Sequence, residues 1–137
     1  MFHQPQLLVM LLNHAQQLAE KALAKASELQ AAVAIVIVDQ GGHVVLAHRM
    51  DRAAYITTEV GRLKATTALN LQAPTHMLAK AAEHTPELRE VLAVAFDKAV
   101  LLPGGFPIVA EGACLGGLGI AGGDFQQDIA IGEYALS

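Results

Sequence analysis

Two stretches far apart in the chain combine residue types that could bind an anion. Arg49 and Asp51 lie two positions apart, so in an extended strand their side chains can face the same side. The guanidinium of an arginine offers a planar fork of N–H donors that matches a carboxylate. The second stretch is Leu102-Pro103-Gly104-Gly105-Phe106-Pro107, whose consecutive glycine amides could form an anion-binding nest.

Each feature also has a purely structural interpretation. Arg49 and Asp51 could form a local ion pair that closes a strand end, and the glycines could form a tight loop before an edge strand. Lys64 lies on an apolar helical turn, where its ammonium could reach solvent along its aliphatic stem or enter the same cleft as a second cation. The binding interpretation predicts one ligand cleft, lined by Arg49, Asp51, Lys64, Gly104, Gly105 and Pro107.

The composition predicts a single domain, residues 1–137, that associates with copies of itself. Of the 137 residues, 53% are apolar and only 4% aromatic. The mean hydropathy of +0.40 is high for a soluble monomer. The longest unbroken apolar run, residues 31–38, is far shorter than the roughly 18–20 residues that span a bilayer. We therefore expect no membrane partner, and a homo-oligomer that buries the surplus apolar surface.

Charge and the terminal sequence argue against other partner classes. The net charge is −4, and the nine Lys and Arg residues are scattered without a run. Nucleic-acid-binding proteins normally carry a basic face, so we expect no nucleic-acid partner. The N-terminal residues lack the basic segment and the small-residue cleavage site of a signal peptide, which makes the cytoplasm the expected location.

Apolar periodicity predicts the first half of the fold. Apolar residues recur at helical spacing over 6–29, and the β-branched run 31–38 predicts a buried strand. A turn leads into a second strand over 43–50. Residues 57–71 predict a helix whose inner side carries Ile56, Val60, Leu63, Thr67 and Leu71.

Turn and capping signals place the remaining elements. A short helix is expected from Thr75, and Thr85-Pro86-Glu87 predicts a further helix that runs to about residue 96. Residues 99–102 predict a short strand, and 106–110 with 113–121 predict a hairpin. Asp124 and Gln127 form a capping-box pattern before the last helix. This order predicts an α+β fold with a largely antiparallel five-stranded sheet flanked by helices.

The segment Gly117-Leu118-Gly119-Ile120-Ala121-Gly122 matches the G-x-G-x-x-G pattern of dinucleotide sites. That function needs a preceding strand and a helix that opens within the motif. These glycines instead lie inside a predicted strand, so the sequence favours a strand against which a helix or a neighbouring subunit packs closely.

Several motifs in colinear order resemble the GlcG/HbpS family of small haem-binding-type proteins, which includes the C-terminal domain of the PduO adenosyltransferases. The resemblance spans nearly the whole chain. The motifs are Val38-Asp39-Gln40-Gly41-Gly42-His43, Arg49-Met50-Asp51, Lys64-Ala65, Pro74-Thr75, Leu102-Pro103-Gly104-Gly105-Phe106-Pro107-Ile108, Gly119-Ile120-Ala121-Gly122 and Gln127-Asp128.

This resemblance implies a profilin-like domain, oligomeric assembly and, in some members, binding of haem or related ligands. It also favours Lys64 as a residue that projects into the site. Two positions depart from the family pattern: Ala121 replaces a common serine, and Ile129 replaces an acid, which puts a polar or metal-binding role there in doubt.

The six histidines predict no structural metal site, because no pair has the spacing of zinc ligands. His76 and His84 flank a short predicted helix, where they would meet only by accident of folding. A single histidine could still ligate haem iron, and the candidates are His14 on the long helix and His48 beside Arg49. A surface or core histidine is the alternative at each position.

We therefore favour a non-catalytic oligomer that binds an anionic small molecule, with haem or another tetrapyrrole as the ligand implied by the resemblance. One alternative is an enzyme acting on a hydroxy or keto acid, with Asp51 or Glu111 as general base and Arg49 or Lys64 holding the substrate carboxylate. A second alternative is an assembly module without any ligand.

Overall fold

A computed structural model describes residues 9–96 and 98–137 of the chain, and within these residues the fold is α+β. The elements in chain order are α1 (Leu12–Glu28), β1 (Ala34–Asp39), β2 (Val44–Arg49), α2 (Thr57–Leu71), α3 (Thr75–His84), α4 (Glu87–Ala95), β3 (Gly105–Ala110), β4 (Ala113–Ala121) and α5 (Phe125–Leu136). The predicted helix over 6–29 is α1, although residues 6–8 lie outside the described residues. In the described part, no helix is both long enough and apolar enough to cross a bilayer.

The sheet consists of four antiparallel strands in the order β2-β1-β4-β3. Both predicted hairpins are present: β1 pairs with β2 and β3 pairs with β4, while β1 and β4 join them at the centre. Five of the six residues of β1 are fully buried, as expected for a β-branched strand with neighbours on both sides. The antiparallel α+β prediction is confirmed.

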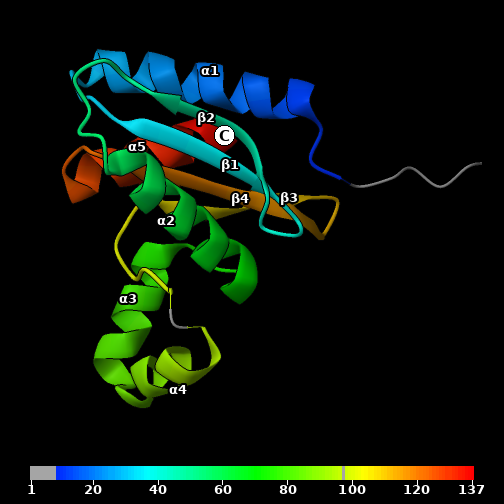
Figure 1. Cartoon of the computed structure of the whole chain (residues 1–137), viewed down its shortest axis with the longest axis vertical. Helices are drawn as coiled ribbons and strands as arrows, with labels where there is room; N and C mark the ends of the chain where they lie inside the picture. Colours follow the sequence, from blue (N-terminus) through cyan, green and yellow to red (C-terminus); the bar gives the residue numbers. More distant parts are fainter. Residues whose placement is uncertain (1–8, 97) are drawn as a thin grey trace, which may run out of the picture.

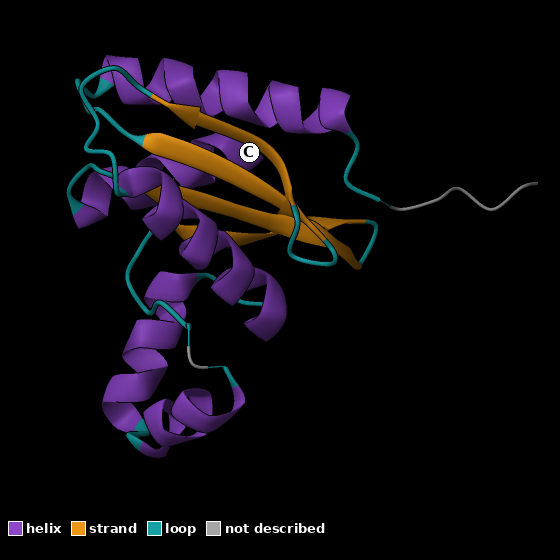
Figure 2. Ribbon diagram, in the orientation of Figure 1, coloured by secondary structure: helices purple, strands orange, loops and turns teal. Residues whose placement is uncertain are grey.

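Helices cover both faces of the sheet (Figures 1 and 2). On one face, α1 and α5 pack over Ile35, Ile37, Leu118 and Ile120. On the other face α2 packs over Val36 and Val38, because alternate residues of a strand point to opposite sides.

Helix α2 lies against β4 at very short range because the strand presents glycines to it. A Cβ atom at Gly117 would collide with the backbone of Ala65, and one at Gly119 would collide with the carbonyl of Gly61. The close-packing interpretation of the glycine motif is therefore confirmed. The predicted inner face of α2 is wrong in part, because only small residues fit at this short helix–strand distance. Ile56 is 67% exposed, whereas Gly61 and Ala65 face the sheet.

The predicted fifth strand over residues 99–102 is wrong, and the described sheet has four strands. Two threonine hydroxyls form hydrogen bonds with backbone groups of this segment that would otherwise pair with a neighbouring strand. The N–H of Val100 donates to Oγ1 of Thr67 at 2.9 Å, and the carbonyl of Leu102 accepts from Oγ1 of Thr75 at 2.6 Å. These bonds hold the segment along α2 and α3 instead of at the sheet edge.

Helices α3 and α4 form a hairpin, which we call the arm, that extends away from the sheet (Figure 1). Helix α4 follows Thr85 and Pro86 as the sequence predicted. At the other end of the chain, Asp124 and Gln127 form the predicted capping box, with the Gln127 N–H donating to Oδ1 of Asp124 at 2.8 Å.

Candidate functional site

Lys64 and Asp128 form an ion pair in the interior of the molecule. Helix α2 supplies Lys64 and the first turn of α5 supplies Asp128, with 3.3 Å between Nζ and Oδ2. The Lys64 ammonium also donates to the carbonyl of Ile120 at 2.9 Å, and Oδ1 of Asp128 accepts from the N–H of Gly123 at 3.0 Å. The pair therefore ties α2 and α5 to the end of β4.

Burial shifts the pKa values of both partners towards each other. Desolvation lowers the pKa of Lys64 from 10.5, against the opposing attraction of Asp128. Desolvation also raises the pKa of Asp128 from 3.8, against the attraction of Lys64 and the N–H of Gly123. Because it is buried and bonded to Asp128 and to the Ile120 carbonyl, the Lys64 ammonium is not a free cation facing solvent.

The Gly104–Gly105 bend lies directly beside this ion pair. Gly104 has a φ of +121°, and a Cβ atom there would collide with the Ile120 carbonyl and lie 3.0 Å from Nζ of Lys64. A Cβ at Gly105 would collide with the Lys64 carbonyl, and the Gly105 N–H donates to Oγ1 of Thr75 at 2.8 Å. Internal packing thus accounts for both glycines, and one of the two amides of the expected anion nest is already bonded.

The structure brings three of the predicted ligand-binding residues together and separates the others from them. Lys64, Gly104 and Gly105 are in contact, and half-buried Pro107 follows along β3 opposite Gly117. Arg49 ends β2, on the opposite edge of the sheet. Three strand spacings of about 4.8 Å separate the two edges, or roughly 14 Å.

Arg49 and Asp51 have separate surroundings at that edge. The Arg49 guanidinium donates to the carbonyl of Ala53 at 3.0 Å and lies 5.0 Å from the ring centroid of Tyr55. No ion pair between Arg49 and Asp51 is present among the described residues. Asp51 lines a pocket of about 650 Å³ with Met50 and Arg52, and Lys64, Gly104 and Gly105 do not line it.

His14 is half-buried on α1, and His48 is exposed on β2 opposite Ile35. Neither lines the Asp51 pocket or the pockets of the arm that are described next. Their assignment as haem ligands stays a prediction. Among residues 9–96 and 98–137, no three His, Cys, Asp or Glu side chains are grouped to hold a metal ion.

A pocket lined by apolar and charged side chains lies where the arm meets α5 and the 101–103 loop, and we call it the arm pocket. Its volume is about 560 Å³. Its wall is mainly apolar and carries two cations and one acid; the lining residues are His76, Ala79, Lys80, Glu83, Arg89, Leu101, Leu102, Pro103, Phe125, Gln126 and Ile129. Leu102 and Phe125 are 45% and 52% exposed, so apolar surface at this pocket is open to a ligand.

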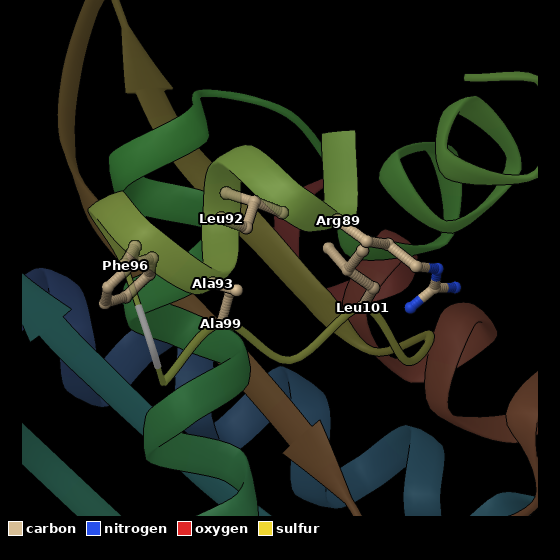
Figure 3. Close-up of a pocket in the computed structure, with 6 residues that line it drawn as sticks. All are labelled: Arg89, Leu92, Ala93, Phe96, Ala99 and Leu101. Atoms are coloured by element: carbon tan, nitrogen blue, oxygen red, sulfur yellow. The ribbon is translucent and has the colours of Figure 1, made fainter. Parts of the chain in front are cut away.

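A smaller pocket of about 210 Å³ adjoins it, between α4 and the segment after it (Figure 3). Arg89 and Leu101 line both pockets. Leu92 and Phe96 add apolar walls, and the Arg89 guanidinium points away from Phe96 in the close-up. Arg89 therefore lies on the boundary between the two pockets.

Sequence reasoning missed the arm pocket because its walls come from residues 76–129, which only the tertiary fold assembles. One signal was available. His76 directly follows Pro74-Thr75, one of the motifs of the family pattern, but we considered it only as a partner for His84. Those two residues lie at opposite ends of α3, about 12 Å apart along the axis.

Comparison with known proteins identifies the family. The family model described as haem degrading protein HbpS-like matches residues 10–137. The chain therefore belongs to the HbpS-like family, as its motifs indicated.

Two curated relatives from Citrobacter freundii are similar in sequence. The corrinoid adenosyltransferase PduO is 37% identical over 121 residues, which is 88% of this chain but only 36% of that protein. An uncharacterized 15.0 kDa protein from the dhaT-dhaS intergenic region is 31% identical over 96% of this chain and 92% of its own length. The chain thus corresponds to about a third of the adenosyltransferase.

Solved structures share the fold. A complex of PduOC with heme has a TM-score of 0.84 and 31% identity, covering 93% of each chain. The Klebsiella pneumoniae protein ORFY has a TM-score of 0.87 and 29% identity, over 99% of this chain and 94% of that one. A variant of Streptomyces reticuli HbpS has a TM-score of 0.83 and 27% identity, over 98% and 88%.

Proposed function

We propose that this protein binds a small planar anionic ligand, with haem or a closely related tetrapyrrole as the principal candidate. The observation that carries the proposal is the arm pocket, a mainly apolar hollow whose wall carries two cations and one acid. Membership of the HbpS-like family and similarity to PduOC in complex with heme support this ligand class. Bound haem would supply an iron centre that can take up small molecules or an electron.

The residues of the arm pocket fit such a ligand in size and polarity. Its volume of about 560 Å³ lies within the range of roughly 300–1,000 Å³ that is typical of small-molecule sites. Leu102, Phe125 and Ile129 would cover the apolar ring and exclude water from it. Lys80 and Arg89 would bind the carboxylates, Arg89 as a planar donor fork and Lys80 as a point charge.

The residues predicted from the sequence take different roles in this proposal. Lys64, Gly104 and Gly105 fix the position of the loop that carries Leu102 and Pro103, and so act on the pocket without touching the ligand. Pro107 would hold the start of β3 in the same way. Arg49 and Asp51 lie at the opposite edge of the sheet and have no contact with the ligand in this proposal.

Self-association also belongs to the proposal, because the arm exposes apolar side chains. Val91 and Val94 on α4 are 60% and 91% exposed, and Met77 on α3 is 56% exposed. An exposed apolar patch on a protein surface often marks a contact with another protein. We propose that copies of the chain cover them in a homo-oligomer.

Titration of the purified protein with hemin, followed by the Soret band, tests the function. We expect saturable binding that weakens several-fold in Arg89→Ala and Lys80→Ala, because each substitution removes a partner for a ligand carboxylate. Arg49→Ala is the matched control and should bind like the wild type. Absence of a Soret shift in the wild type would contradict the proposal. If only Arg49→Ala loses affinity for hemin, the binding site lies at the β2 edge of the sheet instead.

A further inference from the structure

The Asp51 pocket, at the β2 edge of the sheet, takes no part in the proposed function. The end of α1, its connection to β1 and the segment after β2 lie side by side there and form the wall of the pocket (Figure 1). The volume of about 650 Å³ lies in the range of roughly 300–1,000 Å³ that is typical of small-molecule sites. The pocket is therefore large enough to take a small molecule of its own.

The polar side chains that line this pocket are not engaged elsewhere in the fold. Within residues 9–96 and 98–137, none of them has a hydrogen-bond or ion-pair partner; they are Ser27, Gln30, Asp51 and Arg52. The neighbouring Arg49, in contrast, is bonded to the carbonyl of Ala53. Asp51 and Arg52 thus present two opposite charges to the pocket, and both are open to a ligand.

This pair of charges matches a ligand that carries an ammonium and a carboxylate. A carboxylate accepts hydrogen bonds from an ammonium, and a guanidinium offers a planar donor fork to a carboxylate. The last turn of α1, which includes Ser27, favours the ammonium as well, because the C-terminal end of a helix dipole is negative. A purely anionic ligand, such as a phosphate, would instead be repelled by Asp51 beside Arg52.

Apolar side chains complete the lining and indicate which ligand side chain fits. They are Ala31, Ala32 and Met50. Met50 is half-buried, and its sulfur accepts a hydrogen bond from the Val33 N–H at 3.4 Å. A thioether is polarizable and packs readily against aliphatic groups, while the two alanines leave space beside the backbone. An aliphatic side chain would therefore be covered at this wall.

We infer that the Asp51 pocket binds a free α-amino acid with an aliphatic side chain. Asp51 accepts from the ammonium of the ligand, Arg52 donates to its carboxylate, and Met50 with the two alanines covers its side chain. The site is independent of the arm pocket, since the two pockets share no lining residue. The inference thus goes beyond the proposed function and does not rest on it.

The test compares L-leucine with two analogues that each lack one charge. Leucate has a hydroxyl in place of the ammonium, and L-leucinamide has a neutral amide in place of the carboxylate. Each compound is titrated into ¹⁵N-labelled wild type, Asp51→Asn and Arg52→Gln, and amide shifts are followed by NMR. The matched controls are Glu28→Gln, an exposed acid at the end of α1, and Arg62→Gln on α2, because neither residue lines the pocket.

We expect L-leucine to shift the amides of Met50, Asp51 and Arg52 saturably in the wild type. Leucate and L-leucinamide should bind at least about fivefold more weakly, because each loses a charge-assisted hydrogen bond. Asp51→Asn should weaken L-leucine by a similar factor without weakening leucate further. Arg52→Gln should likewise weaken L-leucine but not L-leucinamide. Glu28→Gln and Arg62→Gln should bind L-leucine like the wild type.

The absence of saturable shifts with L-leucine in the wild type would overturn the inference. Leucate that binds as tightly as L-leucine would overturn it too, as would an equal loss of affinity for both compounds in Asp51→Asn. Asp51→Asn and Arg52→Gln should leave hemin binding unchanged, so this outcome is separate from that of the proposed function. Should a variant not fold, the comparison of L-leucine with its two analogues in the wild type decides the inference by itself.

Discussion

The ammonium of Lys64 lies 3.3 Å from the carboxylate of Asp128 in the interior of the protein, with 3% and 2% of the two side chains exposed. The pair joins the helix on one face of the sheet to the first turn of the C-terminal helix, and it also contacts the Gly104 bend. It therefore lies where the 101–103 loop of the arm pocket ends and β3 begins.

Removing one partner of this pair should destabilise the fold strongly. Lys64→Met leaves the Asp128 carboxylate buried without its partner, and we expect a loss of about 3–5 kcal/mol in the free energy of unfolding. The double variant Lys64→Met/Asp128→Leu should recover most of this loss, because neither charge is then desolvated. Urea unfolding followed by circular dichroism measures both.

The matched control is the pair Lys25–Glu28, whose atoms also lie 3.3 Å apart but whose side chains are 24% and 67% exposed. Lys25→Met should change the free energy of unfolding by less than about 1 kcal/mol, because water screens surface charges. If Lys64→Met is as mild as Lys25→Met, the interior pair does not stabilise the fold.

The carboxyl group of Asp128 should titrate above 3.8, because burial raises its pKa. The native state then takes up this proton before the unfolded state does as the pH falls. By linkage, protonation of Asp128 adds to stability in the window between its raised pKa and 3.8, the reverse of a carboxylate with a lowered pKa. The carboxyl carbon shift of Asp128, measured by NMR against pH, gives the midpoint. A midpoint at or below 3.8 would contradict the assigned shift.

Gly104 should tolerate substitution less well than Gly112. Both have positive φ angles, +121° and +79°, so alanine is strained at either position. A Cβ at Gly104 would collide with the Ile120 carbonyl, whereas one at Gly112 meets nothing within 4 Å. We expect Gly112→Ala to cost roughly 1–2 kcal/mol and Gly104→Ala to cost more and to weaken hemin binding. Equal losses in thermal unfolding would show that the close approach is unimportant.

A charge on the exposed face of α4 should disrupt self-association. Val94 is 91% exposed in the single chain, so Val94→Asp should leave the protomer folded. In a homo-oligomer that covers the arm, the same change buries a carboxylate and should shift the assembly towards protomers. Sedimentation velocity of the wild type, Val94→Asp and the control Val44→Asp measures the effect. A wild type that sediments as a 14.4 kDa monomer would refute the oligomer proposal.

The local elements were predictable because short-range signals determine them. Helical periodicity identified α1, and a run of β-branched residues identified β1 as a buried strand. The pairing of Asp124 with Gln127 is a contact within one helical turn, so its sequence pattern was sufficient to place the start of α5.

Long-range contacts explain the parts that the sequence did not reveal. The hydroxyls of Thr67 and Thr75 bond the 100–105 backbone, and this prevents the fifth strand that local propensity favoured. The glycines of β4 bring α2 so close that small residues, not Ile56, face the sheet. The sequence predicted that Arg49 and Gly105 line one cleft, but the strand order places them at opposite edges of the sheet.

Mapping the surface that a porphyrin contacts shows whether the arm pocket receives a planar anionic ligand. Iron-free protoporphyrin IX is titrated into ¹⁵N-labelled protein, and amide shifts are followed by NMR. If the ligand binds in the arm pocket, the largest shifts should fall on residues that line it, namely Ala79, Lys80, Leu101 and Phe125. Shifts centred on Met50, Asp51 and Arg52 at the opposite edge of the sheet would contradict it.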